Sequence, residues 1–242
     1  MNTVFLAALA IGGTTLIGTA CGFLFSRVTD TWNDAVTAFA AGIMLAAATF
    51  GLFAPAMELV AGAGFLLIIA GALCGALFLR LAEGATNRMS GGAGIFRRHP
   101  ELLFVLAIAV HKFPEGMAGG VGLHGMNPAA ASMVVFGIAL QNLPEGVVMI
   151  PPLLAAGVRR SRAAGIALAT GLLNAAGVFV GALWGKNAAG FLPFALAFAG
   201  GAMLDVIIVQ MIPQVCCARR LRQGGLVVMA GFLIMACVNV LF

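Results

Sequence analysis

The chain has 242 residues, of which 62% are hydrophobic and only 9% are charged, and its mean hydropathy is +1.09. A soluble globular domain carries about 25% charged residues, so this composition excludes a soluble enzyme or binding module and indicates a polytopic helical membrane protein. The net charge of +5 would fit a nucleic-acid partner, but the positions of the arginines give it another meaning.

A membrane-spanning helix needs about 20 mostly apolar residues. Eight segments of this kind follow one another along the chain with short connections. They cover approximately residues 4–25, 35–56, 61–81, 102–123, 129–154, 163–184, 188–215 and 226–242. The first is not preceded by a basic residue, so we interpret it as a span of the mature protein rather than as a signal peptide. The sequence predicts an all-α membrane protein with eight transmembrane helices in a single domain, residues 1–242.

The basic residues gather in alternate connections of this arrangement. They are Arg27 after the first span, Arg80, Arg88, Arg97 and Arg98 between the third and fourth, Arg159, Arg160 and Arg162 between the fifth and sixth, and Arg219, Arg220 and Arg222 between the seventh and eighth. Only Lys186 lies on the opposite side. Cytoplasmic loops carry such an excess of Lys and Arg, so the net charge reports topology and requires no nucleic acid. We expect a multi-pass protein of the cell (inner) membrane with both termini outside the cytoplasm.

One sequence motif occurs twice, each time in the middle of an apolar segment. Residues 107–117 read AIAVHKFPEGM, and residues 137–147 read GIALQNLPEGV. An ionisable group near the centre of a bilayer costs at least ~2.5–3.5 kcal/mol, so it usually faces a partner or a water-filled path. Proline-interrupted spans in repeated halves are typical of transporter binding sites, and the two motifs predict such a site.

The spacing within the motifs brings donor atoms together. His111 and Glu115 are four residues apart and share one helix face, and Gln141 and Glu145 repeat this spacing. The proline of each motif cannot donate to the carbonyl four residues earlier and should kink its helix, while the glycine allows another backbone to approach. Because the fourth and fifth spans run in opposite directions in this topology, the motifs should be related as inverted repeats.

If the two motifs face each other, they supply an imidazole, two carboxylates and an amide oxygen. This set suits a borderline divalent cation such as Zn²⁺, and would also accept Fe²⁺, Mn²⁺ or Cd²⁺. A structural alternative stays open, in which the two glutamates and Lys112 simply form buried salt bridges.

These motifs resemble those of the ZIP family of divalent-metal transporters (Zrt/Irt-like proteins), in its prokaryotic branch. HKFPEG resembles the pattern of the family's fourth helix and QNLPEG that of the fifth, while FAAGIML at residues 39–45 resembles the second helix. FAGGAM at residues 198–203, with Ile212 and Pro213, resembles the seventh. The resemblance covers essentially the whole chain. It implies a homodimer in which a transport bundle moves against a scaffold, in an elevator-like manner, and carries metal into the cytoplasm.

The resemblance also implies ligands. The family's first metal site maps to Met44, His111, Glu115, Gln141 and Glu145.

The family's second, adjacent metal site is where this sequence departs. Its asparagine on the fourth helix is Lys112 here, its aspartate on the fifth is Asn142, and its glutamate on the sixth is Asn174 by spacing. Acidic residues expected near the exit are Gln210 and Gln214. Carboxylates have become amides and a cation has been added, so we expect the ammonium of Lys112 to stand in for the second metal.

Three further polar residues are harder to interpret. Asp205 lies within the seventh span and needs a partner, so a relay in the cytoplasmic half, a pairing with lysine and a hydrogen bond between helices all stay open. Glu58 could attract cations at the entrance or be a plain interfacial charge, and His124 is most simply interfacial.

The leading function is transport of a divalent transition metal, without an enzymatic step or a cofactor. A degenerate member of the family with weak or altered ion transport is the nearest alternative. An intramembrane metalloenzyme would need a general base in the manner of HExxH, which the chain lacks. A structural or sensory membrane protein would need an output domain, for which the sequence shows no candidate.

The arginine distribution predicts the orientation of both ends. A periplasmic reporter enzyme fused after Phe242 should be active, and a cytoplasmic reporter at the same place should be silent, because nearly all loop arginines fall on the other side. A C-terminus that reports as cytoplasmic would overturn both the topology and the inverted relation of the motifs.

Overall fold

The computed structural model describes residues 2–25, 30–89, 101–185, 189–217 and 223–241, although at some positions within these ranges only the backbone is described. The described residues contain helices and no strand. In chain order the elements are α1 (Asn2–Phe25), α2 (Asp30–Ala46), η1 (Ala47–Phe53), α3 (Ala54–Glu58), η2 (Gly62–Gly64), α4 (Phe65–Met89), α6 (Glu101–Gly125), α7 (Pro128–Ala155), α8 (Arg160–Gly185), η3 (Ala189–Phe191), α9 (Leu192–Val206), η4 (Ile207–Met211), α10 (Ile212–Cys217) and α11 (Gly224–Leu241).

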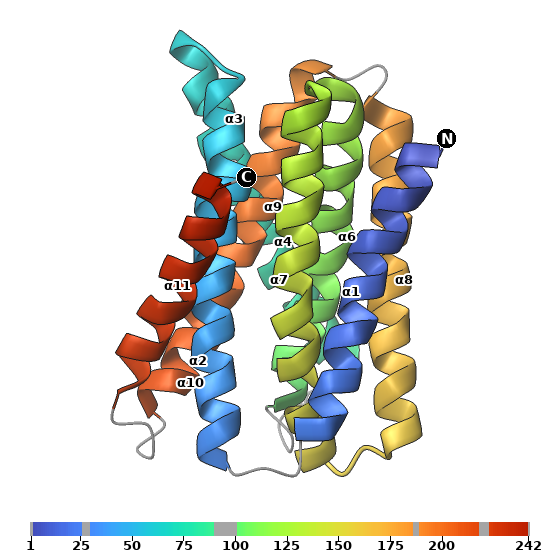
Figure 1. Cartoon of the computed structure of the whole chain (residues 1–242), viewed down its shortest axis with the longest axis vertical. Coiled ribbons are helices and arrows are strands. Elements are labelled where there is room, and N and C mark those ends of the chain that lie inside the picture. The colour runs from blue at the N-terminus through green and yellow to red at the C-terminus, as the bar shows by residue number, and fades with distance from the viewer. Residues whose placement is uncertain (1, 26–29, 90–100, 186–188, 218–222, 242) are drawn as a thin grey trace.

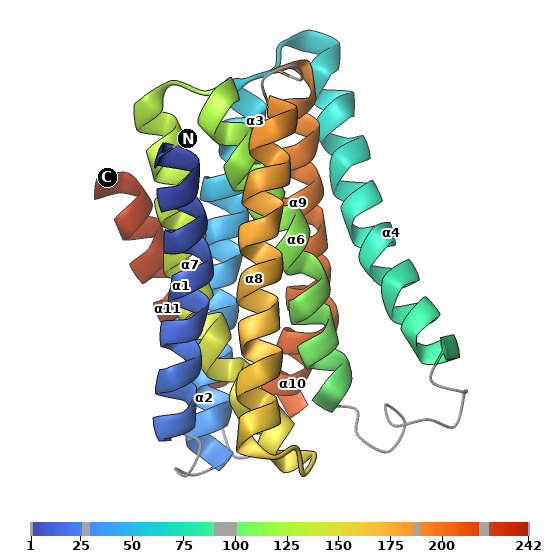
Figure 2. The same cartoon turned by 90° about the vertical axis from the view of Figure 1, so that its right-hand side faces the viewer.

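The long helices run side by side along one axis (Figure 1). Helices α1, α6, α7 and α8 form one side of the molecule, and α2, α9, α10 and α11 form the other. Helix α4 leans away from the bundle at its periphery (Figure 2). The start of α1 and the end of α11 lie toward the same end of the bundle (Figure 1).

The number of candidate membrane spans differs from the expected eight. Within the described residues, six helices are long and apolar enough to cross a membrane: Asn2–Leu24, Thr31–Glu58, Phe65–Ala82, Pro128–Pro151, Arg160–Gly185 and Leu192–Cys216. The predicted eighth span corresponds to a shorter apolar helix, Gly224–Asn239. The predicted fourth span corresponds to α6, which is not among the six and has His111, Lys112 and Glu115 near its middle. The chain is therefore a multi-pass helical membrane protein, with six spans evident from length and apolarity.

Glycines set how closely the helices pack. At six glycines of the described residues a Cβ atom would lie only 1.9–2.1 Å from a carbonyl oxygen of the partner helix, and four of these glycines represent the four different pairs of helices. These contacts are Gly18 of α1 with Leu143 of α7, Gly42 of α2 with Val228 of α11, Gly75 of α4 with Phe198 of α9, and Gly120 of α6 with Val178 of α8. Small residues at helix interfaces are the usual means of close packing in membranes, and here they define four helix pairs.

The prolines of the two motifs lie within continuous helices. Helices α6 and α7 continue as α-helix through Pro114 and Pro144, so the predicted interruption of the helices is wrong, and the kink expected at each proline stays a prediction. Irregularity occurs instead in the other half of the molecule, where each of two π-helical segments ends two residues before a proline, η1 before Pro55 and η4 before Pro213. A proline lacks the N–H of the regular ladder, and π turns are one way in which a helix accommodates the loss.

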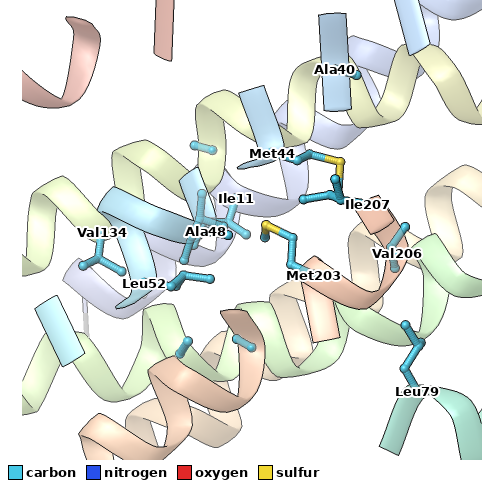
Figure 3. Close-up of a cluster of buried hydrophobic side chains, with 14 of the residues drawn as sticks. Ile11, Ala40, Met44, Ala48, Leu52, Leu79, Val134, Met203, Val206 and Ile207 are labelled. Carbon is cyan, nitrogen blue, oxygen red and sulfur yellow. The ribbon is translucent and has the colours of Figure 1, made fainter. Parts of the chain in front are cut away.

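The buried apolar core lies between the two sides of the molecule. Met44 of α2 and Met203 of α9 extend into it beside Ile11 of α1 and Ile207 of η4 (Figure 3). All four side chains are almost completely buried. The core therefore joins helices from both sides.

The close contact at Gly75 has a measurable consequence. Gly75→Ala places a Cβ 1.9 Å from the Phe198 carbonyl oxygen, so α4 and α9 must separate, at a cost of about 1–3 kcal/mol or more. We expect a lower midpoint of thermal unfolding in detergent. The control is Gly165→Ala in α8, where no atom lies within 4 Å, and there alanine should be neutral or stabilising by up to ~1 kcal/mol. Equal midpoints for the two variants would contradict the close approach.

Candidate metal site

Three potential metal ligands meet inside the bundle. His111 and Glu115 come from α6 and Glu145 from α7, and one ligand atom of each lies within 4.8 Å of the others. The Nε2 atom of His111 is 3.5 Å from Oε2 of Glu145. The three side chains are at most 2% exposed, so the cluster is shielded from bulk solvent.

Local helix geometry explains this meeting. His111 and Glu115 share one face of α6 through their i,i+4 spacing, and the short turn between α6 and α7 brings Glu145 beside them. The glycine after each glutamate faces another helix. A Cβ at Gly116 would lie 2.0 Å from the Asn174 carbonyl oxygen of α8, and one at Gly146 would lie 2.5 Å from the Thr15 carbonyl oxygen of α1. The predicted close backbone approach is thus confirmed at both motifs.

The ammonium of Lys112 lies among the acidic residues and is completely buried. Its Nζ donates to Oε2 of Glu115 at 3.0 Å, and it also contacts Oε2 of Glu145 and Oδ1 of Asn142. An ammonium has three donors and no acceptor, so these three oxygens match its capacity. The helix-surface reach from Lys112 to Glu115 predicted from their i,i+3 spacing is confirmed.

Amide side chains surround the carboxylates. Gln141 donates through Nε2 to Oε1 of Glu115, and Asn174 donates through Nδ2 to Oε2 of the same group at 3.4 Å. Asn142 donates through Nδ2 to the backbone carbonyl of Ile11 at 2.9 Å. Gln141 therefore presents its nitrogen, rather than the expected oxygen, to the acidic group.

The donor set fits a divalent transition metal. Ligand atoms around a tetrahedral Zn²⁺ with bonds of ~2.0–2.2 Å stand roughly 3.3–3.6 Å apart, so the observed cluster needs to contract by only about an ångström. The Oε1 atom of Glu145 is buried and accepts no hydrogen bond from any residue that the structure describes. A buried acceptor of this kind calls for an explanation such as a bound ion.

Met44 has a different environment from the other predicted ligands. It lies in the apolar core beside Ile207 and Met203, with 1% of its surface exposed (Figure 3). Its role as a ligand stays a prediction.

Asp205 is paired with an arginine. The Nε atom of Arg80 in α4 donates to both carboxylate oxygens, at 2.9 and 3.0 Å. Of the alternatives left open for Asp205, the structure shows the hydrogen bond between helices, with an arginine rather than a lysine as the partner. The placement of Arg80 in a connection is wrong, because α4 extends to Met89. A carboxylate within a span needs a compensating cation, and Arg80 provides it while remaining 52% exposed.

The remaining predicted residues lie away from the cluster. Glu58 ends α3 and His124 lies in the last turn of α6, and both are exposed. Gln210 is half-buried within η4, and Gln214 is exposed in α10. Their part in an ion path stays a prediction. Arg27, Arg97, Arg98, Lys186, Arg219, Arg220 and Arg222 lie outside the described residues.

Sequence reasoning missed the part that α1 plays in the site. The carbonyl of Ile11 accepts from Asn142 and also from the hydroxyl of Thr14, at 2.9 and 3.1 Å. A backbone carbonyl is present at every residue, so only the tertiary arrangement identifies this one.

Comparison of the sequence with known proteins identifies a family. The family model described as "ZIP Zinc transporter" matches residues 89–239. The chain is 40% identical to "Zinc transporter GufA" of Myxococcus xanthus over 69% of its length and 70% of that protein. It is 30% identical to "Zinc transporter ZIPB" of Bordetella bronchiseptica, over 97% of this chain and 81% of the relative. It is also 27% identical to human "Zinc transporter ZIP11", with 94% of each chain covered.

The apolar helices and the buried cluster of His111, Glu115 and Glu145 thus define a multi-pass membrane protein with a candidate metal site in its interior. The chain belongs to the ZIP zinc transporter family.

Proposed function

We propose that this protein carries a divalent transition-metal ion, zinc foremost, into the cytoplasm through one central site formed by His111, Glu115 and Glu145. The observation that carries the proposal is the meeting of these three buried ligands within 4.8 Å. The bacterial relatives named zinc transporters support it. Fe²⁺, Mn²⁺ and Cd²⁺ suit the same donor set, and Gln141 and Met44 complete it as weaker ligands.

The membrane arrangement that this function needs has eight spans. Helix α6 has 25 residues, or about 37 Å of helix, and α11 has 18 residues, or about 27 Å. Both are long enough to join the six apolar spans, if α6 is shielded by its neighbours at its charged centre. Eight spans place both termini on one side, outside the cytoplasm of the inner membrane, and make the two motifs inverted repeats. The equivalent contacts of Gly116 with α8 and Gly146 with α1 support this relation.

The helices divide into a group that holds the proposed metal site and a group that does not, and this division suggests which helices move with the ion. Apart from the weaker ligand Met44, which lies in α2, the proposed metal ligands and the amides around them belong to α6, α7 and α8, and α1 supplies a carbonyl. These four helices form one side of the molecule (Figure 1). We assign them to a transport bundle and the remaining helices to a scaffold, within one domain of residues 1–242 that pairs as a homodimer. The elevator-like movement and the dimer are drawn from the family resemblance.

Lys112 makes this a site for one ion. With His111 neutral, two carboxylates and one ammonium leave the empty site at −1 and the loaded site at +1. A second divalent ion about 4 Å from the ammonium would be repelled by roughly 8 kcal/mol at an effective dielectric constant of 20. Asn142 and Asn174 offer no charge to offset this repulsion. The three oxygens around Nζ support the assignment of Lys112 to the place of a second metal.

Transport by the purified protein can be tested directly. Purified protein in liposomes should take up Zn²⁺, and His111→Ala or Glu115→Gln should reduce the initial rate at limiting Zn²⁺ by at least about tenfold, since a tenfold weaker affinity requires only ~1.4 kcal/mol. Ser132→Ala, an exposed position on α7, is the control and should transport normally. A panel of divalent ions in the same assay identifies the substrate.

If the unmodified protein is correctly inserted but takes up no ion, the alternative holds, and the protein is a degenerate member of the family with weak or altered ion transport. Uptake unchanged in both site variants would show that the ion takes another route.

The substitution of Lys112 for a second metal ion can be tested by metal content and stability. The unmodified protein should bind one metal per chain, and Lys112→Asn should remain able to transport. Without the ammonium, two buried carboxylates lose a shared partner, and breaking a buried pair costs about 3–5 kcal/mol. The metal-free variant should therefore melt earlier, and Zn²⁺ should raise its melting temperature more than that of the unmodified protein.

Metal content and melting temperature with and without Zn²⁺ provide the measurement. If the unmodified protein binds two metals per chain, with Lys112 displaced, then the ammonium of Lys112 does not occupy the place of a second metal ion.

A further inference from the structure

The two ends of the Asn142 amide have different partners. Its Oδ1 accepts from Nζ of Lys112, and its Nδ2 donates to the carbonyl of Ile11 at 2.9 Å. The side chain is completely buried. The carbonyl can only accept and the ammonium can only donate, so the two partners together determine the orientation of the amide.

An aspartate could not have the same pair of partners. It would still accept from Lys112, but a carboxylate has no N–H to donate to Ile11, and two oxygens would face each other at the 2.9 Å contact. The replacement of the family's aspartate by Asn142 is therefore matched to Lys112 and to α1, rather than being a mere loss of charge.

The ammonium competes with a metal ion for oxygens. Lys112 contacts Oε2 of Glu115 and Oε2 of Glu145, and the latter oxygen is also 3.5 Å from Nε2 of His111. Among the acceptors of Lys112 in the described part of the chain, Asn142 is the one that is not a proposed metal ligand. Asn142 keeps the ammonium toward α1 and thereby weakens the contacts of the ammonium with the two carboxylates.

We propose that Asn142 is a positioning residue, which anchors the ammonium of Lys112 on the α1 side and so leaves Glu115 and Glu145 available to the transported ion. This inference rests on the proposed function, because it assumes that these carboxylates bind the ion. Asn142 acts through Lys112 and need not touch the metal.

A double-mutant cycle tests the inference. Zn²⁺ binding to purified protein is measured by titration calorimetry for the unmodified chain, Asn142→Ala, Lys112→Met and the double variant. In the presence of Lys112, loss of Asn142 should weaken Zn²⁺ binding by tenfold or more, because the ammonium then keeps only its contacts with the two carboxylates. In the Lys112→Met background, the same change should alter the dissociation constant by less than about twofold. Tenfold against twofold is a coupling well above the ordinary non-additivity of distant sites.

The matched control is Asn239→Ala. Asn239 also donates Nδ2 to a helix carbonyl, that of Met235 at 3.0 Å, but it lies in α11 and belongs to no part of the site. Its removal should leave Zn²⁺ affinity unchanged, which separates the loss of an asparagine–carbonyl hydrogen bond from the positioning of Lys112.

A second variant keeps the test decisive if Asn142→Ala does not fold. Asn142→Asp preserves shape and the acceptor for Lys112, so Zn²⁺ affinity should be at least that of the unmodified protein. Its melting temperature should fall, because a carboxylate oxygen then faces the Ile11 carbonyl, which keeps only its donors within α1. Weaker Zn²⁺ binding in Asn142→Asp would overturn the inference. An equal loss of affinity from Asn142→Ala in both backgrounds, or no loss in either, would do the same. Absence of Zn²⁺ binding by the unmodified protein would defeat the proposed function as well, so the two failures are distinguishable.

Discussion

Two carboxylates, Glu115 and Glu145, lie inside a bundle of apolar helices with almost none of their surface exposed. Transfer of an ionised group into such surroundings is expensive unless an opposite charge and hydrogen bonds accompany it. Lys112 supplies the charge, and Gln141, Asn142 and Asn174 supply amide contacts around the carboxylates and the ammonium. The rest of the structure can be understood as the means of holding these groups together.

Close helix packing is the first of these means. Gly116 brings the α8 backbone against α6 and thereby places Asn174 beside Glu115, while Gly146 brings α1 against α7 and places the Ile11 carbonyl within reach of Asn142. Without a Cβ at either position, the amides can reach the buried charges. The glycine of each motif therefore contributes to the electrostatics of the site by allowing these polar groups to approach.

The two sides of the molecule differ in their irregularities. Helices α6 and α7 keep the α-helical conformation through the prolines beside the metal ligands, although each proline lacks an N–H to donate, whereas π-helical segments precede Pro55 and Pro213 on the other side. That side also has the Arg80–Asp205 pair between α4 and α9. Local distortion is thus concentrated in the helices assigned to the scaffold, and the helices that hold the ligands remain regular. A regular helix preserves the i,i+4 alignment of His111 with Glu115.

Sequence alone determined the class of the protein, because 62% hydrophobic residues and few charges allow only membrane helices. It also indicated which residues could meet, since four-residue spacing puts His111 and Glu115 on one face of a helix and the repeated motif supplies Glu145. That the two motifs face each other is seen only in the structure. Tertiary structure decided what depends on contacts between distant segments: the pairing of Asp205 with Arg80, the donation of Gln141 through its nitrogen, and the link from Asn142 to Ile11. Spacing along a helix is encoded locally. The orientation of an amide and the partner of a carboxylate depend on which helices lie next to each other. The glycines allow these helices to approach, and the helix pairs are known only from the packed bundle.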